Sequence, residues 1–267
     1  SRASIIGVTT VGAAILGFTL NLFISYYFGA AGETDAFIMA QSTSELLLKL
    51  LLGGSIAAVF LPMFVERIVQ NRKDEAWHLA LNLLHITSFI LMFALGLLAV
   101  FAGPFVRYVI APGFSPETVD LTVGLLYILI PSFLCLFLVD LSTAMLHSLR
   151  RFALPASLRL VAPIISILSV VLLARSLGIY ALAIGVTVGA ILQLSILLTG
   201  LHWQGLHYQF IFSPLDPGMR RLVRLVLPFA FVALAAVLAG VTYRILASYL
   251  SPGSLSTLKY AEKITQF

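Results

Sequence analysis

Long apolar stretches recur along the whole chain, and each is about as long as a helix that crosses a lipid bilayer. The clearest cover residues 76–101, 119–147 and 177–202. A transmembrane helix needs about 20 predominantly apolar residues, and in lipid only helices and closed β-barrels satisfy their backbone hydrogen bonds. Barrel strands would alternate polar and apolar residues in segments of about ten, whereas these stretches are continuous. The sequence therefore predicts an all-α polytopic membrane protein.

The composition agrees with this fold class and excludes several functions. Of the 267 residues, 60% are hydrophobic and 10% are charged, whereas soluble domains carry about 25% charged residues. The single cysteine, Cys135, cannot form a disulfide within the chain. The sequence contains no Walker loop, no dinucleotide-binding glycine motif and no zinc-type histidine spacing. We therefore expect a protein that is not an enzyme and has no cofactor or metal.

Seven transmembrane spans and the start of an eighth can be placed from the apolar stretches. Gly53-Gly54 could bend the long second span, and Pro131 could kink the fourth. The segment between the third and fourth spans, residues 102–118, is expected to be a loop. The predicted spans cover residues 3–28, 34–65, 76–101, 119–147, 155–174, 177–202 and 219–250, and the eighth begins near Leu255.

The basic residues predict how the chain is oriented in the membrane. With the N-terminus in the cytoplasm, the inner loops and adjoining span ends hold ten of them and the outer loops hold two, Arg107 and Arg175. Cytoplasmic loops are typically rich in Lys and Arg, so the N-terminus is expected inside. The same bias explains the net charge of +5 without a nucleic-acid partner. The ten inner residues are Arg2, Arg67, Arg72, Lys73, Arg150, Arg151, Arg159, Arg220, Arg221 and Arg224.

A polar segment at residues 204–218 separates two groups of spans. It follows the sixth span and contains Pro214. Many transporters consist of two repeated halves, so we expect a six-helix N-lobe at 1–203, a cytoplasmic linker at 204–218 and the first one to two helices of a C-lobe at 219–267. The chain begins without Met and ends within the predicted eighth helix, so both ends look trimmed.

Ionisable residues inside the predicted spans are the candidates for function. Glu45 and Lys49 lie in the apolar middle of the second span, and their i, i+4 spacing places them on one face of a helix. Charges within a membrane usually face a cavity or one another, so the two residues either form a structural ion pair or line a cavity. Arg244 in the seventh span could likewise face a cavity or extend to the interface. The other candidates are Asp35, Glu262 and Lys263.

Short motifs occur in a characteristic order from the first span to the last. They include Phe28-Gly29-Ala30, Thr34-Asp35-Ala36-Phe37, Ala111-Pro112-Gly113-Phe114, Arg151-Phe152-Ala153-Leu154-Pro155-Ala156, Asp216-Pro217-Gly218-Met219-Arg220-Arg221 and Tyr260-Ala261-Glu262-Lys263. By these motifs the chain resembles the MurJ/MviN family of lipid II flippases, in the multidrug/oligosaccharidyl-lipid/polysaccharide exporter superfamily. The resemblance implies a two-lobed helical bundle around a central cationic cavity.

Several basic positions of that family hold other residues here. The resemblance implies arginines where Ala14, Leu20 and Leu48 stand, whereas Lys49 remains basic. Glu45 replaces a neutral residue, and Asp35 and both signs at Glu262-Lys263 are kept. Lysine lacks the planar donor fork with which arginine holds phosphate. The resemblance therefore implies a substrate site of reduced positive charge, formed by Lys49, Lys263, Asp35, Glu45, Glu262 and Arg244.

Three functions follow from these observations. The resemblance implies a flippase that moves a polyprenyl-diphosphate-linked cell-wall precursor, lipid II or a relative, across the bacterial cytoplasmic membrane by alternating access. The loss of cavity arginines instead favours a transport-inactive structural subunit of a larger membrane complex. An ion-coupled exporter of small amphiphiles is the third. The expected partners are the lipid-linked precursor, membrane lipids and, for the second function, other membrane subunits.

Overall fold

The apolar stretches form helices throughout the part of the chain that the computed structural model describes, which is residues 2–52, 55–206 and 208–265. Side chains are described for these residues except 2–6, 44, 47–52, 55–58 and 263–265. No β-strand occurs in the described ranges, so the predicted all-α class is confirmed. The elements are α1 (Arg2–Phe28), α2 (Gly32–Leu52), α3 (Ser55–Val69), α4 (Lys73–Val100), α5 (Ala102–Phe105), η1 (Val106–Ile110), α6 (Pro116–Ser148), α7 (Ala153–Leu158), α8 (Val161–Leu177), α9 (Tyr180–Trp203), α10 (Pro217–Ser248) and α11 (Ser254–Thr265).

Within the described residues, six helical segments are long and apolar enough to cross a membrane. They match every predicted span from the first to the seventh except the second. That span coincides with α2 and α3, which lie on either side of residues 53–54, and the bend expected at Gly53-Gly54 falls outside the described residues. The chain is therefore a multi-pass membrane protein. The six segments are Gly7–Phe28, Lys73–Val100, Pro116–Ser148, Ala153–Leu177, Tyr180–Trp203 and Pro217–Ser248.

Two segments differ from the sequence prediction. The fifth span is divided into α7 and α8, with Arg159 and Leu160 between them. Pro163 has no N–H to donate to the carbonyl of Arg159, so an unbroken helix would lack a hydrogen bond at this point. Residues 102–110 were expected in a loop but form α5 and the π-helical η1. Gly103-Pro104 lies in the first turn of α5, where proline is tolerated because an N–H there would have no intrahelical acceptor.

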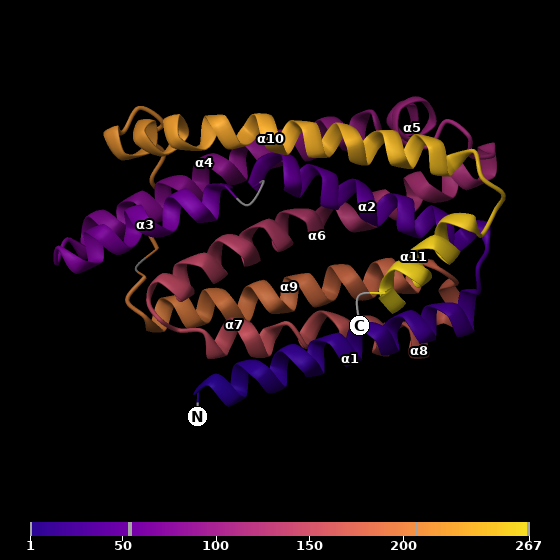
Figure 1. Cartoon of the computed structure of the whole chain (residues 1–267), viewed down its shortest axis with the longest axis horizontal. Coiled ribbons are helices and arrows are strands. Elements are labelled where there is room, and N and C mark those ends of the chain that lie inside the picture. Colours follow the sequence, from indigo (N-terminus) through magenta and orange to yellow (C-terminus); the bar gives the residue numbers. More distant parts are fainter. Residues whose placement is uncertain (1, 53–54, 207, 266–267) are drawn as a thin grey trace.

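The long helices lie side by side in one elongated bundle, with α10 along one edge and α11 crossing at an angle near α1 and α9 (Figure 1). Helix α6 is central, because it contacts α2, α3, α4 and α9. Fully buried aromatic side chains of α3 and α6 contribute to this core, namely Phe60, Phe64, Phe133 and Phe137. Helix α8 packs closely on α9 at Gly185, where an added Cβ would lie 2.8 Å from the Cα of an α8 residue.

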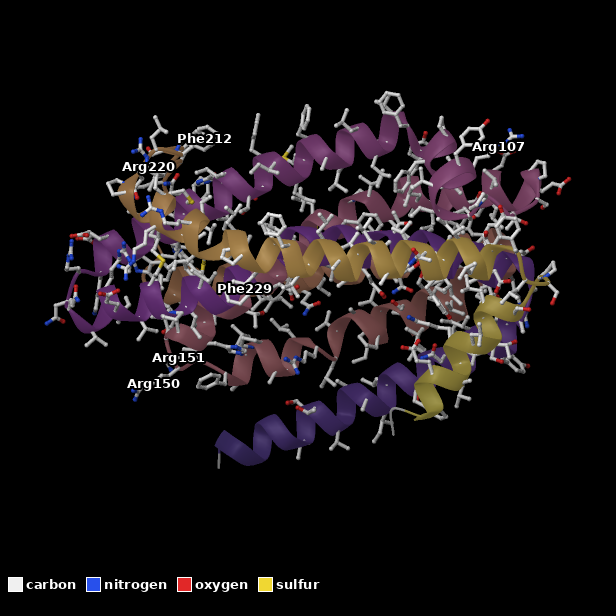
Figure 2. The ribbon with its side chains drawn as sticks, turned by 45° about the horizontal axis from the view of Figure 1, so that its top comes forward. Arg107, Arg150, Arg151, Phe212, Arg220 and Phe229 are labelled. Atoms are coloured by element: carbon white, nitrogen blue, oxygen red, sulfur yellow. The ribbon has the colours of Figure 1, made fainter. Side chains whose placement is uncertain are left out.

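The two ends of the bundle differ in charge. The basic end comprises the α3–α4, α6–α7 and α9–α10 connections, and the far end comprises the α1–α2, α8–α9 and α10–α11 turns and residues 101–115. Figure 2 shows Arg150, Arg151 and Arg220 at the basic end and Arg107 at the far end. The charge bias predicted from the loops is therefore a property of one end of the folded bundle.

The segment between α9 and α10 is fixed to α4 by two polar side chains. Asn82 donates to the carbonyl of Ser213 and accepts from its N–H, both at 2.8 Å. His85 Nδ1 lies 3.1 Å from the carbonyl oxygen of Ile211, and Nε2 lies 3.2 Å from Tyr208 Oη. Both α4 residues are buried. Because buried polar groups require partners, these contacts hold the segment against α4 rather than leave it loose.

Candidate functional site

Helices α1, α2, α9 and α11 enclose a cavity of about 500 Å³. This is within the size range of small-molecule pockets, about 300–1,000 Å³. Most of its wall is apolar, and the polar side chains are Asn21, Gln41, Glu45, Lys259 and Tyr260. The apolar part is formed by Ala13, Ala14, Gly17, Phe18, Leu20, Ile24, Phe37, Ile38, Leu182 and Val186.

Of the six residues predicted to form the substrate site, Glu45 is the one among the described lining residues of the cavity. The half-buried Glu45 lines its wall with Asn21, and so do Ala14 and Leu20, which stand where the resembled family has arginines. Small and apolar side chains at these positions leave space but remove positive charge. The described wall thus carries one carboxylate, Glu45, and one ammonium group, Lys259. An amphiphile with a charged headgroup suits such a wall better than a purely apolar molecule.

Asp35, in the first turn of α2, is not among the residues that line the cavity, and its side chain faces the start of α11. Its side chain is 3% exposed. Oδ2 accepts the N–H of Gly253 at 2.6 Å, and Oδ1 accepts the N–H of Ser256 at 2.7 Å. The first N–H groups of a helix have no intrahelical acceptor, and negative charge is stabilised near them. Asp35 therefore caps α11 from another helix.

Two glycines allow the backbones around Asp35 to approach each other. Gly253 has φ +88°, and an added Cβ would lie within 2.5 Å of the carbonyl oxygen of Ala30. Gly113 donates its N–H to Ser248 Oγ at 3.0 Å, and its added Cβ would lie 2.5 Å from the carbonyl oxygen of Ser248. We call these contacts the Asp35 junction, formed by Asp35, Ala30, Gly113, Ser248, Gly253 and Ser256. At this junction, α10 and the start of α11 contact α2, the α1–α2 turn and the segment before α6.

Arg244 connects α10 with α2 inside the bundle. Its Nε donates to Ser42 Oγ at 2.8 Å, and its Nη2 donates to the carbonyl of Ser42 at 3.2 Å. Its Nη1 donates to the carbonyl of Gly240 at 2.9 Å. The guanidinium is attracted by the negative charge of Glu45, one turn beyond Ser42 on α2. Arg244 therefore faces α2, and it is not among the described residues that line the cavity.

The remaining candidates are placed less fully. Lys49 lies in α2 and Lys263 in α11, but both side chains fall outside the described residues, so the Glu45–Lys49 pair stays a prediction. Glu262 is exposed on α11. Lys259, one turn before Lys263, lines the cavity.

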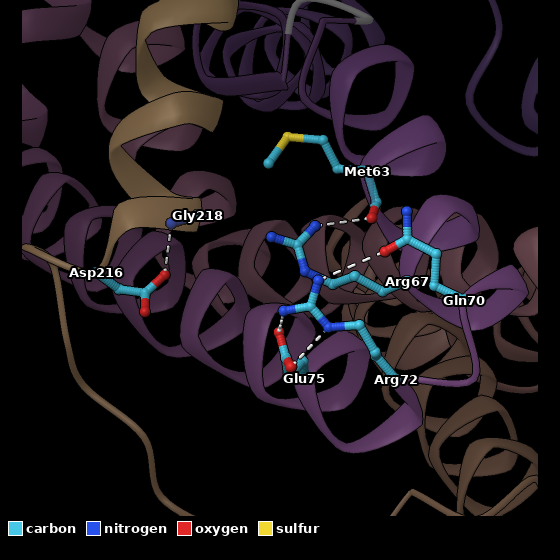
Figure 3. A network of polar contacts seen from close by, with 7 residues as sticks. All are labelled: Met63, Arg67, Gln70, Arg72, Glu75, Asp216 and Gly218. Atoms are coloured by element: carbon cyan, nitrogen blue, oxygen red, sulfur yellow. Dashed lines mark hydrogen bonds and ion pairs between the residues drawn. The ribbon is translucent and has the colours of Figure 1, made fainter.

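Charged side chains of α3, of the α3–α4 turn and of the start of α10 gather at the basic end (Figure 3). Arg67 donates to the carbonyl of Met63 at 2.8 Å, and a Cβ added to Gly218 would lie 3.1 Å from Arg67 Nη2. Glu66 pairs with Arg221 at 3.7 Å, and both side chains are about half exposed. Exposed ion pairs contribute little to stability. The exposed Glu66–Arg221 pair is therefore expected to contribute less to stability than the buried hydrogen bonds of the Asp35 junction.

Of the polar side chains in the cavity wall, the predicted site includes Glu45 and omits four, namely Asn21, Gln41, Lys259 and Tyr260. Gln41 lies four residues before Glu45, so helical periodicity already places the two on one face. Lys259 likewise lies four residues before Lys263. The partners of Asp35 are 218 and 221 residues away in sequence. No local pattern could have indicated them.

Comparison with known proteins agrees with this geometry. Residues 24–267 match the family model described as lipid II flippase MurJ. A probable lipid II flippase MurJ from Rhizobium tropici is 28% identical, with 98% of this chain and 50% of that protein covered. The chain thus spans about half the length of the curated relatives it matches.

Solved structures share the fold. A lipid II flippase MurJ in an inward closed conformation superposes with a TM-score of 0.83 at 23% identity, over 98% of this chain and 54% of that one. An inward-facing multidrug resistance MATE family transporter of the MOP superfamily gives a TM-score of 0.69 at 13% identity, over 95% of this chain and 58% of that one. Together with the match over residues 24–267, these observations show that the chain belongs to the lipid II flippase MurJ family.

Proposed function

We propose that the chain is part of a flippase that carries a polyprenyl-diphosphate-linked cell-wall precursor, lipid II or a relative, across the bacterial cytoplasmic membrane. The observation that carries the proposal is the cavity between α1, α2, α9 and α11 in a chain of this family. Its apolar wall with a few charged groups suits a lipid-linked molecule with a phosphate headgroup. The related protein from Rhizobium tropici is named a probable lipid II flippase.

Lysines of α2 and α11 hold the diphosphate in this proposal. Lys259 lines the cavity, and Lys263 lies on the same face of α11 because the two are four residues apart. Lys49 supplies a further positive charge from α2. Charge-assisted hydrogen bonds to phosphate are among the strongest that side chains form. Glu45 and Glu262 reduce the positive charge of the site, and Arg244 holds α10 against α2.

Opening of the Asp35 junction gives access to the cavity from the far end. The proposed N-lobe at residues 1–203 and the start of the C-lobe at 219–267 meet at this junction, and the linker at 204–218 joins them at the basic end. The concentration of arginines at the basic end favours a cytoplasmic location for that end and for the N-terminus. The far end then faces outward, where the precursor is released.

The proposal is tested by translocation in cells that depend on the full-length protein containing this chain. The measured quantity is the amount of precursor that becomes accessible at the outer leaflet. We expect the Lys49→Ala/Lys259→Ala/Lys263→Ala variant to lose most translocation. Lys73→Ala, an exposed lysine at the basic end, is the matched control and keeps it. Full translocation by the triple variant would contradict the proposed diphosphate site.

A transport-inactive subunit is the alternative, and the family's lipid II flippases do not favour it. It predicts that the unmodified protein translocates nothing and co-purifies with a stoichiometric membrane partner. Translocation by the unmodified protein would exclude it.

A further inference from the structure

A second cavity, of about 340 Å³, lies at the basic end between the end of α6, α7 and the end of α9. It is separate from the cavity between α1, α2, α9 and α11, in which the proposed transport takes place and which we call the transport cavity. The transport cavity reaches Val186 on α9, whereas the second reaches Gly200. These residues are 14 apart (200 − 186), which corresponds to about 21 Å along a helix. The residues that matter for its chemistry are Arg150, Arg151, Phe152, Leu154, Trp203 and Gln204.

The wall of this cavity combines two guanidinium groups with apolar side chains. Arg151 Nε donates to Gln204 Oε1 at 3.0 Å, which ties the end of α6 to the end of α9. The other four N–H groups of that guanidinium belong to its η nitrogens. None of the described residues that line the cavity is acidic. An anionic group beside apolar chains therefore suits it, and arginine is the side chain best suited to phosphate.

The backbone at Arg150 is a second, independent observation. Three neighbouring helices, α3, α6 and α9, end at the basic end with the same pair of hydrogen bonds. In α6, Arg150 N–H donates to His147 O and Arg151 N–H donates to Leu146 O. This pattern places the residue after the cap in the left-handed region, where glycine is usual. The equivalent residues are Asn71 with φ 58° in α3 and Gly205 with φ 94° in α9.

Arg150, with φ 57°, is the one residue of these three whose side chain is long and not suited to the left-handed region. Glycine adopts this conformation without steric cost, and asparagine tolerates it, but a long side chain does so at a cost in stability. Residues held in such conformations tend to cluster at functional sites. The strained backbone at Arg150 therefore favours a functional role for its guanidinium in the cavity, one that compensates for the loss of stability.

We propose that this cavity binds the phosphate headgroup of an anionic membrane phospholipid. Its position suits the membrane interface, because Trp203 is 80% exposed at the end of α9 and tryptophan is enriched at that depth. Figure 2 shows Arg150 and Arg151 together at the basic end. Basic pockets between helix ends on the cytoplasmic side are suited to anionic headgroups. The site is outside the transport cavity, so the proposal stands or fails independently of flippase activity.

Trp203 provides a direct probe of the bound lipid. The chain has two tryptophans, and Trp77→Phe leaves Trp203 as the only one. This variant is reconstituted into phosphatidylcholine vesicles that contain a low, equal mole fraction of either brominated phosphatidylglycerol or brominated phosphatidylcholine. Bromine quenches tryptophan fluorescence at contact. We expect quenching by the brominated anionic lipid to indicate about a five-fold enrichment beside Trp203, the effect of a basic side chain on anionic lipid binding.

The decisive variant is Arg150→Gly with Arg151→Gln. Glycine relieves the left-handed strain at residue 150, so the variant is expected to fold, which circular dichroism and thermal unfolding check. The enrichment should fall to about that of the neutral lipid. Arg220→Gln, an exposed arginine at the same end but not among the residues lining the cavity, is the matched control and keeps the enrichment.

Three results would overturn the proposal. Unchanged enrichment in the folded double variant would assign the effect to the general charge of the basic end. Equal loss in Arg220→Gln would do the same. Removal of the enrichment by millimolar inorganic phosphate would identify a free phosphate site rather than a lipid site.

Discussion

Two carboxylates on one helix, α2, have opposite surroundings. Asp35 is 3% exposed and accepts the N–H groups of Gly253 and Ser256 at the start of α11, whereas Glu45 lines the cavity between α1, α2, α9 and α11. They are ten residues apart (45 − 35), about 15 Å along the helix. A carboxylate fixed by a helix N-terminus stabilises one arrangement of two helices. A carboxylate in a cavity wall remains available to influence a ligand. The comparison separates a carboxylate that joins two helices at the far end from one that lines the cavity, and under the proposed function only the second acts on a ligand.

The largest expected effect is that of Asp35→Ala. The substitution leaves the N–H groups of Gly253 and Ser256 buried without their acceptor. Each unsatisfied buried group costs about 1–3 kcal/mol, so we expect a loss of about 2–5 kcal/mol in the free energy of unfolding. Denaturation of the purified protein in detergent measures it. Asp120→Ala, an exposed aspartate near the start of α6, is the control and should change stability little. Equal effects of the two would show that Asp35 is not a special cap.

The glycines of positive φ provide the second test. Gly253 and Gly205 have φ +88° and +94°, but only Gly253 has a neighbour within 4 Å of an added Cβ, the carbonyl of Ala30. Because alanine is strained at positive φ, both Gly→Ala variants should lose about 1–2 kcal/mol in the free energy of unfolding. Gly253→Ala should cost about 1–3 kcal/mol more, because the clash forces the junction apart. The difference between the two unfolding free energies isolates close packing at the junction, and no difference would mean that the turn adjusts freely.

The third test concerns the connection between the two regions, Arg244 with Ser42. A double-mutant cycle with Arg244→Met and Ser42→Ala isolates the hydrogen bond that Arg244 Nε donates to Ser42 Oγ. A hydrogen bond with one charged partner contributes about 1.5–3 kcal/mol, of which we expect about 1–2 kcal/mol as coupling in unfolding free energy. Thr242→Ala, exposed on α10 with its hydroxyl bonded to its own helix, should show no coupling with Ser42→Ala. Additive effects of Arg244 and Ser42 would mean that the bond contributes nothing to helix packing.

The smallest expected effect is that of Glu45→Gln. Because Glu45 lies in the cavity wall, its neutralisation should change unfolding by less than about 0.5 kcal/mol. It should instead strengthen binding of a diphosphate-linked precursor by about three- to ten-fold, since removal of a like charge about 7 Å from a phosphate at an effective dielectric of about 35–80 is worth about 0.6–1.4 kcal/mol. Lys259→Gln should weaken binding to a similar extent. Titration of both variants with the precursor in detergent checks the signs, and equal shifts in the same direction would contradict the binding role of the wall.

The sequence predicted six of the seven spans because each is a long apolar stretch. It singled out Glu45 because a charge in such a stretch requires a polar environment, but it left open whether Glu45 lines a cavity or pairs with Lys49. It could not predict the role of Asp35. The carboxylate accepts hydrogen bonds from backbone N–H groups more than 200 residues away. Every residue except proline has such a group, so the sequence does not indicate which ones Asp35 contacts. The orientation of Arg244 was likewise unpredictable, because its partner Ser42 is distant in sequence and belongs to no recognisable motif. The helical turns at residues 102–110 were missed because Gly103-Pro104 reads equally well as a loop or as the first turn of a helix.

The central claim is that the Asp35 junction opens and closes the far end of the cavity during transport. Spin labels on cysteines at Glu33 and Ser251, both exposed beside the junction, report its state in otherwise cysteine-free full-length protein in lipid. Double electron–electron resonance should give a single short distance between the two labels in the resting protein. With the lipid-linked precursor, or in the Asp35→Asn variant, a second population with a longer distance should appear. A single unchanged distance in protein that actively translocates the precursor would contradict the claim.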